Sequence, residues 1–174
     1  MSHRPLAPLL ISGACLLTAC ATARPAIAHV DTLEVWTGTM GVPVIASVPL
    51  GPLAPPYGVV HIGYTRNSQL RHAWKDFGAW QFEAVADSAS AYDIAVRSDG
   101  LASMALADRS RRLIFAERTP GGWVLDTLGT YPGIEMRVSL ALAPDASPAI
   151  AFVVAGPGSV NSLRYARRSG AGWT

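Results

Sequence analysis

The chain has 174 residues, of which 50% are hydrophobic and 15% are charged. This composition predicts a packed core rather than disorder, and the length suits one ordinary domain. The formal net charge of +2 is too small to indicate a nucleic-acid partner. The sequence contains no glycine-rich phosphate loop and no nucleophile elbow, so no cofactor is expected.

The first 19 residues have the pattern of an export signal. Arg4 supplies a positive start, and residues 6–17 form an apolar stretch shorter than the roughly 20 residues of a membrane-spanning helix. Residues 17–19 (Leu-Thr-Ala) precede Cys20, and this sequence resembles the lipobox of bacterial lipoproteins. The resemblance implies cleavage before Cys20 and a lipid on its sulfur. An ordinary secretory signal, cut after a small residue such as Ala19 or Ala21 without lipidation, is the alternative.

A lipidated Cys20 would attach the chain to a membrane by lipid alone. Ala21 follows it where aspartate would resemble an inner-membrane retention signal, so we expect an exported protein in the cell envelope, at the outer membrane if the host has one. The mature chain would then have no cysteine for a disulfide or a thiolate metal site. Residues 20–29 are small and include Pro25, which predicts a short tether before a domain over residues 30–174.

That domain contains an internal repeat. Trp123 follows Trp80 by 43 residues, and Trp173 follows Trp123 by 50, close to the roughly 40–50 residues of one four-stranded propeller blade. Around each tryptophan the same residue types recur at fixed distances. The recurring positions are Leu70, Leu113 and Leu163; His72, Phe115 and Tyr165; and Ala73, Ala116 and Ala166. The repeat divides the domain into units of about residues 42–88, 89–132 and 133–174.

Each unit carries alternating strand patterns separated by turn residues. Expected strands in the second unit cover 93–98, 101–107, 112–118 and 123–128. In the third unit they cover 137–143, 148–154 and 162–168, with a fourth beginning at Trp173. Since no segment has helical periodicity with caps, the expected fold is all-β, built from four-stranded antiparallel blades.

The repeated order resembles bacterial β-propeller repeats of the sialidase-like or BNR-like type over about residues 42–174. The Asp-box of sialidases (Ser-x-Asp-x-Gly-x-x-Trp) is lacking, because Asp99 and Asp145 lie on an earlier turn. Sialidase activity is therefore not implied. Propellers usually have about four to eight blades, so this resemblance implies a partial propeller of about three blades.

Such a partial propeller is expected to be a truncated piece of a longer protein or to close by association. Residues 30–33 (Val-Asp-Thr-Leu) resemble part of 124–128 (Val-Leu-Asp-Thr-Leu). Residues 30–36 are therefore a candidate fourth strand, donated to an incomplete blade of the same chain or a neighbour. Open blade edges also favour self-association.

Lys75, Arg118 and Arg168 each lie five residues before the repeated tryptophan. Strict register would place them at one end of successive blades, as a basic rim for an anionic sugar, a phosphate or an acidic protein. The alternative is that they form ion pairs, with Glu83 and Asp126 as candidate partners.

The aromatic residues fall into two groups. Trp80, Trp123 and Trp173 recur beside glycine or alanine, which favours structural packing between blades over sugar stacking. Trp36 and Trp74 lie outside this register and are the better candidates for contact with a ligand.

His61 and His72 are expected on neighbouring strands, opposite one another across a turn at residues 66–68. Two facing imidazoles are a candidate metal pair. However, His72 occupies the position of Phe115 and Tyr165, and no third ligand is clearly placed. We therefore expect packed rings and no metal.

The sequence identifies no catalytic residue. The leading hypothesis is a lipid-anchored cell-envelope module that binds a protein or glycan without catalysis. The alternative is a carbohydrate-active propeller enzyme, either a hydrolase or a lyase, since carboxylates from different blades can converge at a channel. This alternative allows the catalytic part to lie outside this chain.

Overall fold

The computed structural model describes residues 39–48, 59–75, 79–134, 137–170 and 172–174, which all belong to the compact unit Leu33–Thr174. They form strands joined by turns, with one short 3-10 turn, η1 (Pro157–Ser159). In this described part, no helix is long and apolar enough to cross a membrane. The all-β prediction is confirmed.

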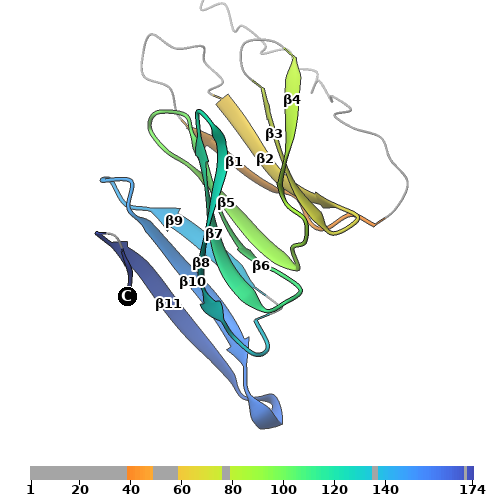
Figure 1. Ribbon diagram of the computed structural model, residues 1–174, viewed down its shortest axis with the longest axis vertical. Coiled ribbons are helices and arrows are strands. Elements are labelled where there is room, and N and C mark those ends of the chain that lie inside the picture. The colour runs from red at the N-terminus through yellow and green to blue at the C-terminus, as the bar shows by residue number, and fades with distance from the viewer. Residues whose placement is uncertain (1–38, 49–58, 76–78, 135–136, 171) are drawn as a thin grey trace, which may run out of the picture. The chain divides into compact units, whose positions relative to one another are not determined.

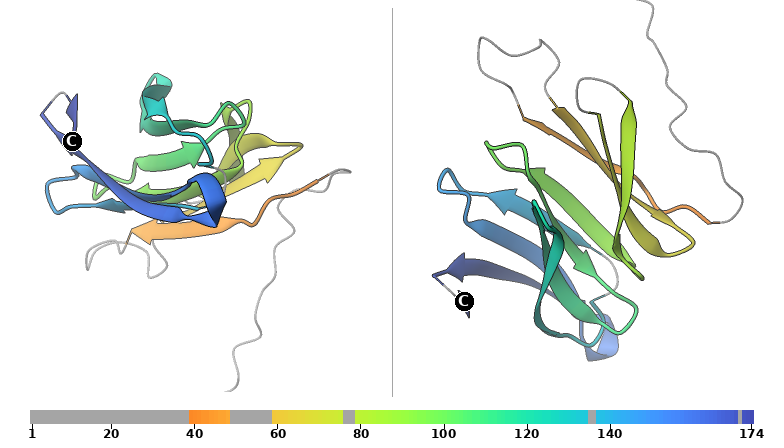
Figure 2. Two further views of the ribbon diagram at one scale, coloured as in Figure 1. Left: turned by 90° about the horizontal axis from the view of Figure 1, so that it is seen from below. Right: turned by 45° about the horizontal axis from the view of Figure 1, so that its top comes forward.

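The described residues form three four-stranded antiparallel sheets, and each contains consecutive strands in chain order. Sheet I contains β1 (Val44–Val48), β2 (Val59–Arg66), β3 (Gln69–Lys75) and β4 (Trp80–Ala86). Sheet II contains β5 (Ala91–Val96), β6 (Ala102–Ala107), β7 (Arg112–Thr119) and β8 (Gly122–Thr130). Sheet III contains β9 (Val138–Leu142), β10 (Pro148–Ala155), β11 (Asn161–Ser169) and β12 (Gly172–Trp173). In Figure 1 the sheets run from orange to yellow-green, from green to teal, and through blue, and the same grouping is visible in both views of Figure 2.

The strands predicted in sheets II and III match the observed ones within two residues at each end, and the first strand of sheet II is the one displaced as a whole. It was expected at 93–98 and instead spans Ala91–Val96. The N–H of Arg97 donates to the carbonyl of Leu101, and the N–H of Gly100 donates to that of Arg97. These bonds close the turn earlier than the sequence indicated.

The two faces of each sheet have different neighbours. We call the face toward the preceding sheet the front and the face toward the following sheet the back. One apolar cluster joins the back of sheet I to the front of sheet II, including Leu70 and Ile94. A second joins the back of sheet II to the front of sheet III, including Leu113 and Leu140.

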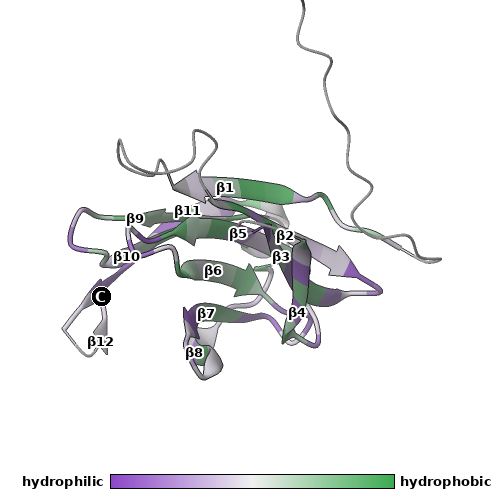
Figure 3. Cartoon of the chain, turned by 90° about the horizontal axis from the view of Figure 1, so that it is seen from above, coloured by the Kyte–Doolittle hydropathy of each residue, from purple (hydrophilic) through white to green (hydrophobic). Residues whose placement is uncertain are grey.

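Sheet II is therefore covered on both faces. All six residues of β6 are buried, and Figure 3 shows the hydrophobic colour along this strand. A strand covered on both sides needs an apolar run rather than alternation, and Ala-Ser-Met-Ala-Leu-Ala fits this need.

Consecutive sheets also meet along their first strands, since β1 contacts β5 and β5 contacts β9. Asp93 of β5 connects sheets II and III. Its Oδ2 accepts the backbone N–H of Leu140 at 2.8 Å and the hydroxyl of Ser139 at 3.2 Å. The candidate donated strand, residues 30–36, lies outside the described residues.

Candidate functional site

Neighbouring sheets share one contact that occurs twice. The indole Nε1 of Trp123 donates to Glu83 Oε1 of sheet I at 2.8 Å, and Nε1 of Trp173 donates to Asp126 Oδ2 of sheet II at 2.9 Å. Each acid lies three residues after the tryptophan of its own sheet. Each indole also meets a ring edge to face, Trp123 on His72 and Trp173 on Phe115, both with centroids 5.4 Å apart.

The two repeated arginines lie in these contacts between sheets. Arg118 donates from Nε to Glu83 Oε1 at 2.7 Å, which is the ion pair given as the alternative to a basic rim. Arg168 pairs with Glu117 Oε2 at 3.5 Å and lies over the ring of Phe115. Asp126 accepts from an indole instead of pairing with an arginine. The repeat did not predict the Arg168–Glu117 pair, because the two residues belong to different repeat positions.

Glu83, His72 and His61, all in sheet I, form a hydrogen-bonded relay. Glu83 Oε1 lies 2.9 Å from His72 Nδ1, and His72 Nε2 lies 2.9 Å from His61 Nδ1. When both rings are neutral, His72 Nδ1–H donates to the carboxylate and His61 Nδ1–H donates to His72. This leaves the buried His61 Nε2 as an acceptor that has no hydrogen-bond partner among the residues described.

The surroundings of the relay favour neutral rings beside an ionised carboxylate. Burial, together with the charge of His72, lowers the pKa of His61 from 6.5 to about 4. Burial also lowers the pKa of His72, although Glu83 opposes this effect. For Glu83, burial raises the pKa, but hydrogen bonds from Arg118, His72 and Trp123 together lower it below its usual value.

The predicted geometry of the two histidines needs two corrections. His61 pairs with Trp74 and His72 with Gly63, so the imidazoles meet diagonally rather than directly opposite one another. A carboxylate does lie beside the pair, because β4 pairs with β3 and places Glu83 opposite His72. Among the described residues, no group of three histidine, cysteine or acidic side chains is arranged to hold a metal ion.

Of the remaining predicted residues, Trp74 lies beside His72 and Arg118, whereas Lys75 lies beside Trp80 instead. Trp74 stacks on His72 with centroids 5.0 Å apart, and Arg118 lies over its ring. Lys75 is exposed, with its Nζ 5.7 Å from the ring centroid of Trp80. Trp36 and Cys20 lie outside the described residues.

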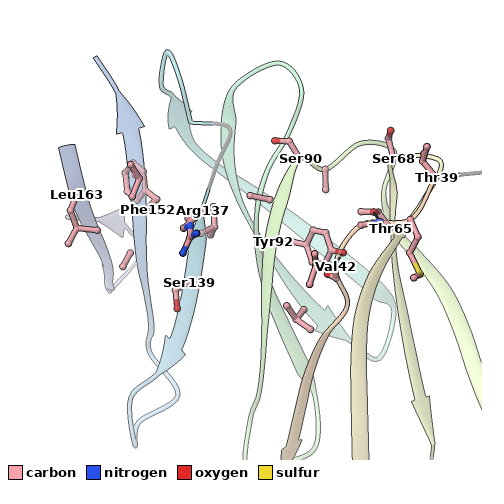
Figure 4. Close-up of a pocket in the computed structure, with 18 residues that line it drawn as sticks. Thr39, Val42, Thr65, Ser68, Ser90, Tyr92, Arg137, Ser139, Phe152 and Leu163 are labelled. Carbon is pink, nitrogen blue, oxygen red and sulfur yellow. Dashed lines mark hydrogen bonds between the residues drawn. The ribbon is translucent and has the colours of Figure 1, made fainter. Parts of the chain in front are cut away.

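A hollow of about 810 Å³ opens where the first strands of the sheets meet (Figure 4). Its lining comes from β1, β2, β5, β9, β10 and β11, from the turn between β2 and β3, and from the segments before β1, β5 and β9. The lining residues are Thr39, Met40, Gly41, Val42, Val44, Thr65, Ser68, Ala89, Ser90, Ala91, Tyr92, Arg137, Val138, Ser139, Ala151, Phe152, Val153 and Leu163.

Most of this lining is apolar, with a few polar groups around it. The hydroxyl of Tyr92 donates to the carbonyl of Val42 at 2.6 Å, and burial raises the pKa of this phenol. The hydroxyl of Thr65 accepts the N–H of Gly41 at 2.8 Å. Exposed Arg137 is the cation of the lining, and its guanidinium has no ion-pair or hydrogen-bond partner among the described residues.

Sequence reasoning did not identify these residues. Arg137, Ser90 and Tyr92 occupy no shared repeat position. Ser90 and Tyr92 lie at the start of sheet II, whereas Arg137 directly precedes β9 of sheet III. The sequence feature that could have indicated them is the predicted order of the strands, since the first strands of successive blades are expected to converge.

No family model matches this chain, and no curated protein sequence does. Among solved structures, the chain is similar to a fucose lectin from Kordia zhangzhouensis in complex with methyl-fucoside. The sequence identity is 15%, the TM-score is 0.48, and the match covers 75% of this chain and 95% of the lectin.

Proposed function

We propose that this chain is a lipid-anchored module of the cell envelope that binds an anionic glycan in the hollow at the first strands, without catalysis. The observation that carries the proposal is the guanidinium of Arg137 in the lining of this hollow, which has no ion-pair or hydrogen-bond partner in the part of the chain that the structure describes. An arginine fork binds a carboxylate or phosphate through two parallel hydrogen bonds.

The size and lining of the hollow suit such a ligand. Its volume lies within the roughly 300–1,000 Å³ of small-molecule sites, which combine apolar walls with a few polar groups. Hydroxyl groups of Ser90 and Ser139 stand with Arg137 around apolar walls. The described lining contains hydroxyls and a guanidinium but no carboxylate, whereas glycoside hydrolysis requires a pair of carboxylates in most families. This chemistry favours the binding module over the enzyme.

The propeller assignment is part of the proposal. Each sheet is a four-stranded antiparallel meander, and successive sheets pack back to front in chain order. First strands line the hollow as the inner strands of blades line a propeller channel. The export and lipidation of the chain are supported by the sequence around Cys20.

Titration calorimetry with 3′-sialyllactose and its neutral counterpart lactose tests the proposed site. We expect the purified chain to bind the sialylated sugar more tightly, and Arg137→Ala to weaken that binding about 10–100-fold, the usual effect of losing hydrogen bonds to a charged group. Arg167→Ala is the matched control, because it removes an exposed arginine outside the lining. Equal binding by wild type and Arg137→Ala, or no binding of the sialylated sugar, would overturn the proposal.

A further inference from the structure

A second guanidinium lies beside the hollow, next to the turn between β2 and β3 of sheet I. Nη2 of Arg109 donates to Ser68 Oγ at 2.6 Å, and Ser68 belongs to the lining of the hollow. Arg109 is exposed, and within the described part of the chain it has no acidic partner. The lining therefore has a cation within hydrogen-bond distance of one of its hydroxyl groups, in addition to Arg137.

The turn between β6 and β7 explains why Arg109 lacks an acidic partner. The adjacent Asp108 is only 2% exposed. Its Oδ1 accepts the backbone N–H of Arg112 at 2.9 Å, and its Oδ2 accepts the Nε–H of Arg112 at 2.8 Å. The carboxylate nearest to Arg109 in the sequence is therefore used inside the turn, and the side chain of Arg109 extends to Ser68 of sheet I instead.

Ser68 holds this guanidinium and keeps its own hydroxyl proton available. The hydroxyl oxygen accepts from Arg109, whereas the hydroxyl proton has no acceptor among the residues that the structure describes. The carbonyl of Ser68 accepts the N–H of Ala89 at 2.8 Å, so the turn is held against the segment before β5. An anion at this end of the hollow would meet the Ser68 hydroxyl as a donor, together with the remaining N–H groups of the Arg109 fork.

Arg137 and Ser68 lie at opposite ends of the lining. Figure 4 shows Arg137 at one side and Ser68 at the other, with Tyr92 between them. Arg137 directly precedes the first strand of sheet III, whereas Ser68 belongs to sheet I, and sheet II packs between these two sheets. A single carboxylate therefore cannot contact both guanidiniums. The described lining contains no carboxylate that would neutralise either of them.

We propose that the hollow selects a glycan that carries at least two acidic groups, one bound by Arg137 and the other by Ser68 and Arg109. This inference rests on the function proposed above and adds the number and the placement of the charges. The part of the ligand between the two acidic groups faces the apolar walls and Tyr92. Because the Tyr92 hydroxyl donates to the carbonyl of Val42, its oxygen can accept a hydrogen bond from a sugar hydroxyl. The ligand class is therefore an acidic oligosaccharide rather than a single acidic sugar.

A binding role for Arg109 and a purely structural role make different predictions. If Arg109 only joins the turns of sheets I and II, its loss should weaken every ligand of the hollow equally, or none of them. If Arg109 binds a second acidic group, its loss should weaken only those ligands that are long enough to present one. The number of acidic groups on a probe of otherwise constant chemistry therefore separates the two roles.

Titration calorimetry with N-acetylneuraminic acid and its α2,8-linked trimer measures this difference. We expect the wild type to bind the trimer at least about tenfold more tightly than the monomer, beyond the gain of about threefold that three equivalent sugar residues supply. Arg109→Ala should remove most of this difference and leave the affinity for the monomer within about twofold of the wild-type value. Arg109→Lys should retain part of it, since lysine keeps the charge without the fork. Arg167→Ala is again the matched control, because it removes an exposed arginine outside the lining.

This inference and the proposed function fail on different results. A trimer that binds no more than about threefold more tightly than the monomer, or a trimer affinity that Arg109→Ala leaves unchanged, would overturn the second acidic contact. Equal weakening of monomer and trimer by Arg109→Ala would also contradict this contact, because a structural role predicts that result. In each of these cases the proposed function stands as long as Arg137→Ala weakens monomer binding. Monomer binding that does not depend on Arg137 would overturn the proposed function, and the second contact with it.

Discussion

At the scale of single residues, the buried imidazole of His61 makes stability depend on pH. Its pKa in the folded chain is about 4, compared with 6.5 for an ordinary histidine. Between these two pH values the unfolded chain binds a proton on this imidazole, whereas the folded chain does not. The contribution of neutral His61 to the free energy of unfolding is about 3 kcal/mol. It is fully present above about pH 6.5 and is lost as the pH falls toward 4. The lowered pKa values of His72 and Glu83 act in the same direction.

The variant His61→Phe tests this coupling, since it fills the site with a ring that cannot titrate. Between pH 7 and pH 4.5 we expect the variant to lose about 2 kcal/mol less unfolding free energy than the wild type. Urea unfolding followed by tryptophan fluorescence measures this difference. Tyr92→Phe is the control: it removes a hydrogen bond, but the raised pKa of Tyr92 lies above this range, so its effect should be the same at both pH values. An unchanged pH dependence in His61→Phe would contradict the prediction.

At the scale of elements, the turn that leads from sheet II to sheet III depends on Gly133. Its φ is +78°, and a Cβ there would lie 2.7 Å from the carbonyl oxygen of Ala155. Gly158 also has a positive φ, +69°, but a Cβ there would have nothing within 4 Å. The two glycines therefore separate the cost of a left-handed backbone from the cost of a clash.

We expect Gly158→Ala to lower the free energy of unfolding by about 1 kcal/mol, the usual cost of a left-handed conformation. Gly133→Ala should lower it by about 3 kcal/mol or more, because the added methyl group also pushes against the backbone of β10. Urea unfolding of the three proteins at one pH measures both values. Equal effects of the two substitutions would show that the clash is relieved by a shift of the turn.

The strands were predictable from the sequence, but the contacts between sheets were only partly so. The repeat around Trp80, Trp123 and Trp173 gives the position of each strand in its sheet, and local turn residues give most ends. The position of a residue in its own sheet does not show which side chains of the neighbouring sheet an acidic residue will contact. Glu83 was predicted as a partner for a cation, yet it also accepts from His72 and Trp123, because one β4 side chain lies between two sheets.

At the scale of the whole molecule, the site was harder to predict than the sheets. A repeat identifies residues that recur, whereas Arg137 and Tyr92 occur once each and meet only because the first strands of different sheets converge. Conversely, the recurrent Arg118 and Arg168 were attractive ligand candidates and instead have acidic partners between sheets. In this fold, recurrence indicates packing between sheets, and a ligand site must be sought among the residues that differ between units.

The position of the whole molecule in the cell depends on Cys20, and a pair of cysteine variants tests it. The proposed signal contains two cysteines, of which only Cys20 follows Leu-Thr-Ala; Ser12 precedes Cys15 where leucine is favoured. We expect wild type and Cys15→Ser to enter the detergent phase of a phase-separating extraction and to carry acyl chains on the N-terminal peptide by mass spectrometry. A single acyl chain binds membranes only marginally and stable attachment needs two signals, so the peptide should carry more than one. Cys20→Ser should carry none, because serine lacks the thiol that accepts the lipid. Acylation of the Cys20→Ser chain, or an unmodified wild-type N-terminus, would contradict the lipoprotein assignment and favour an ordinary secretory signal.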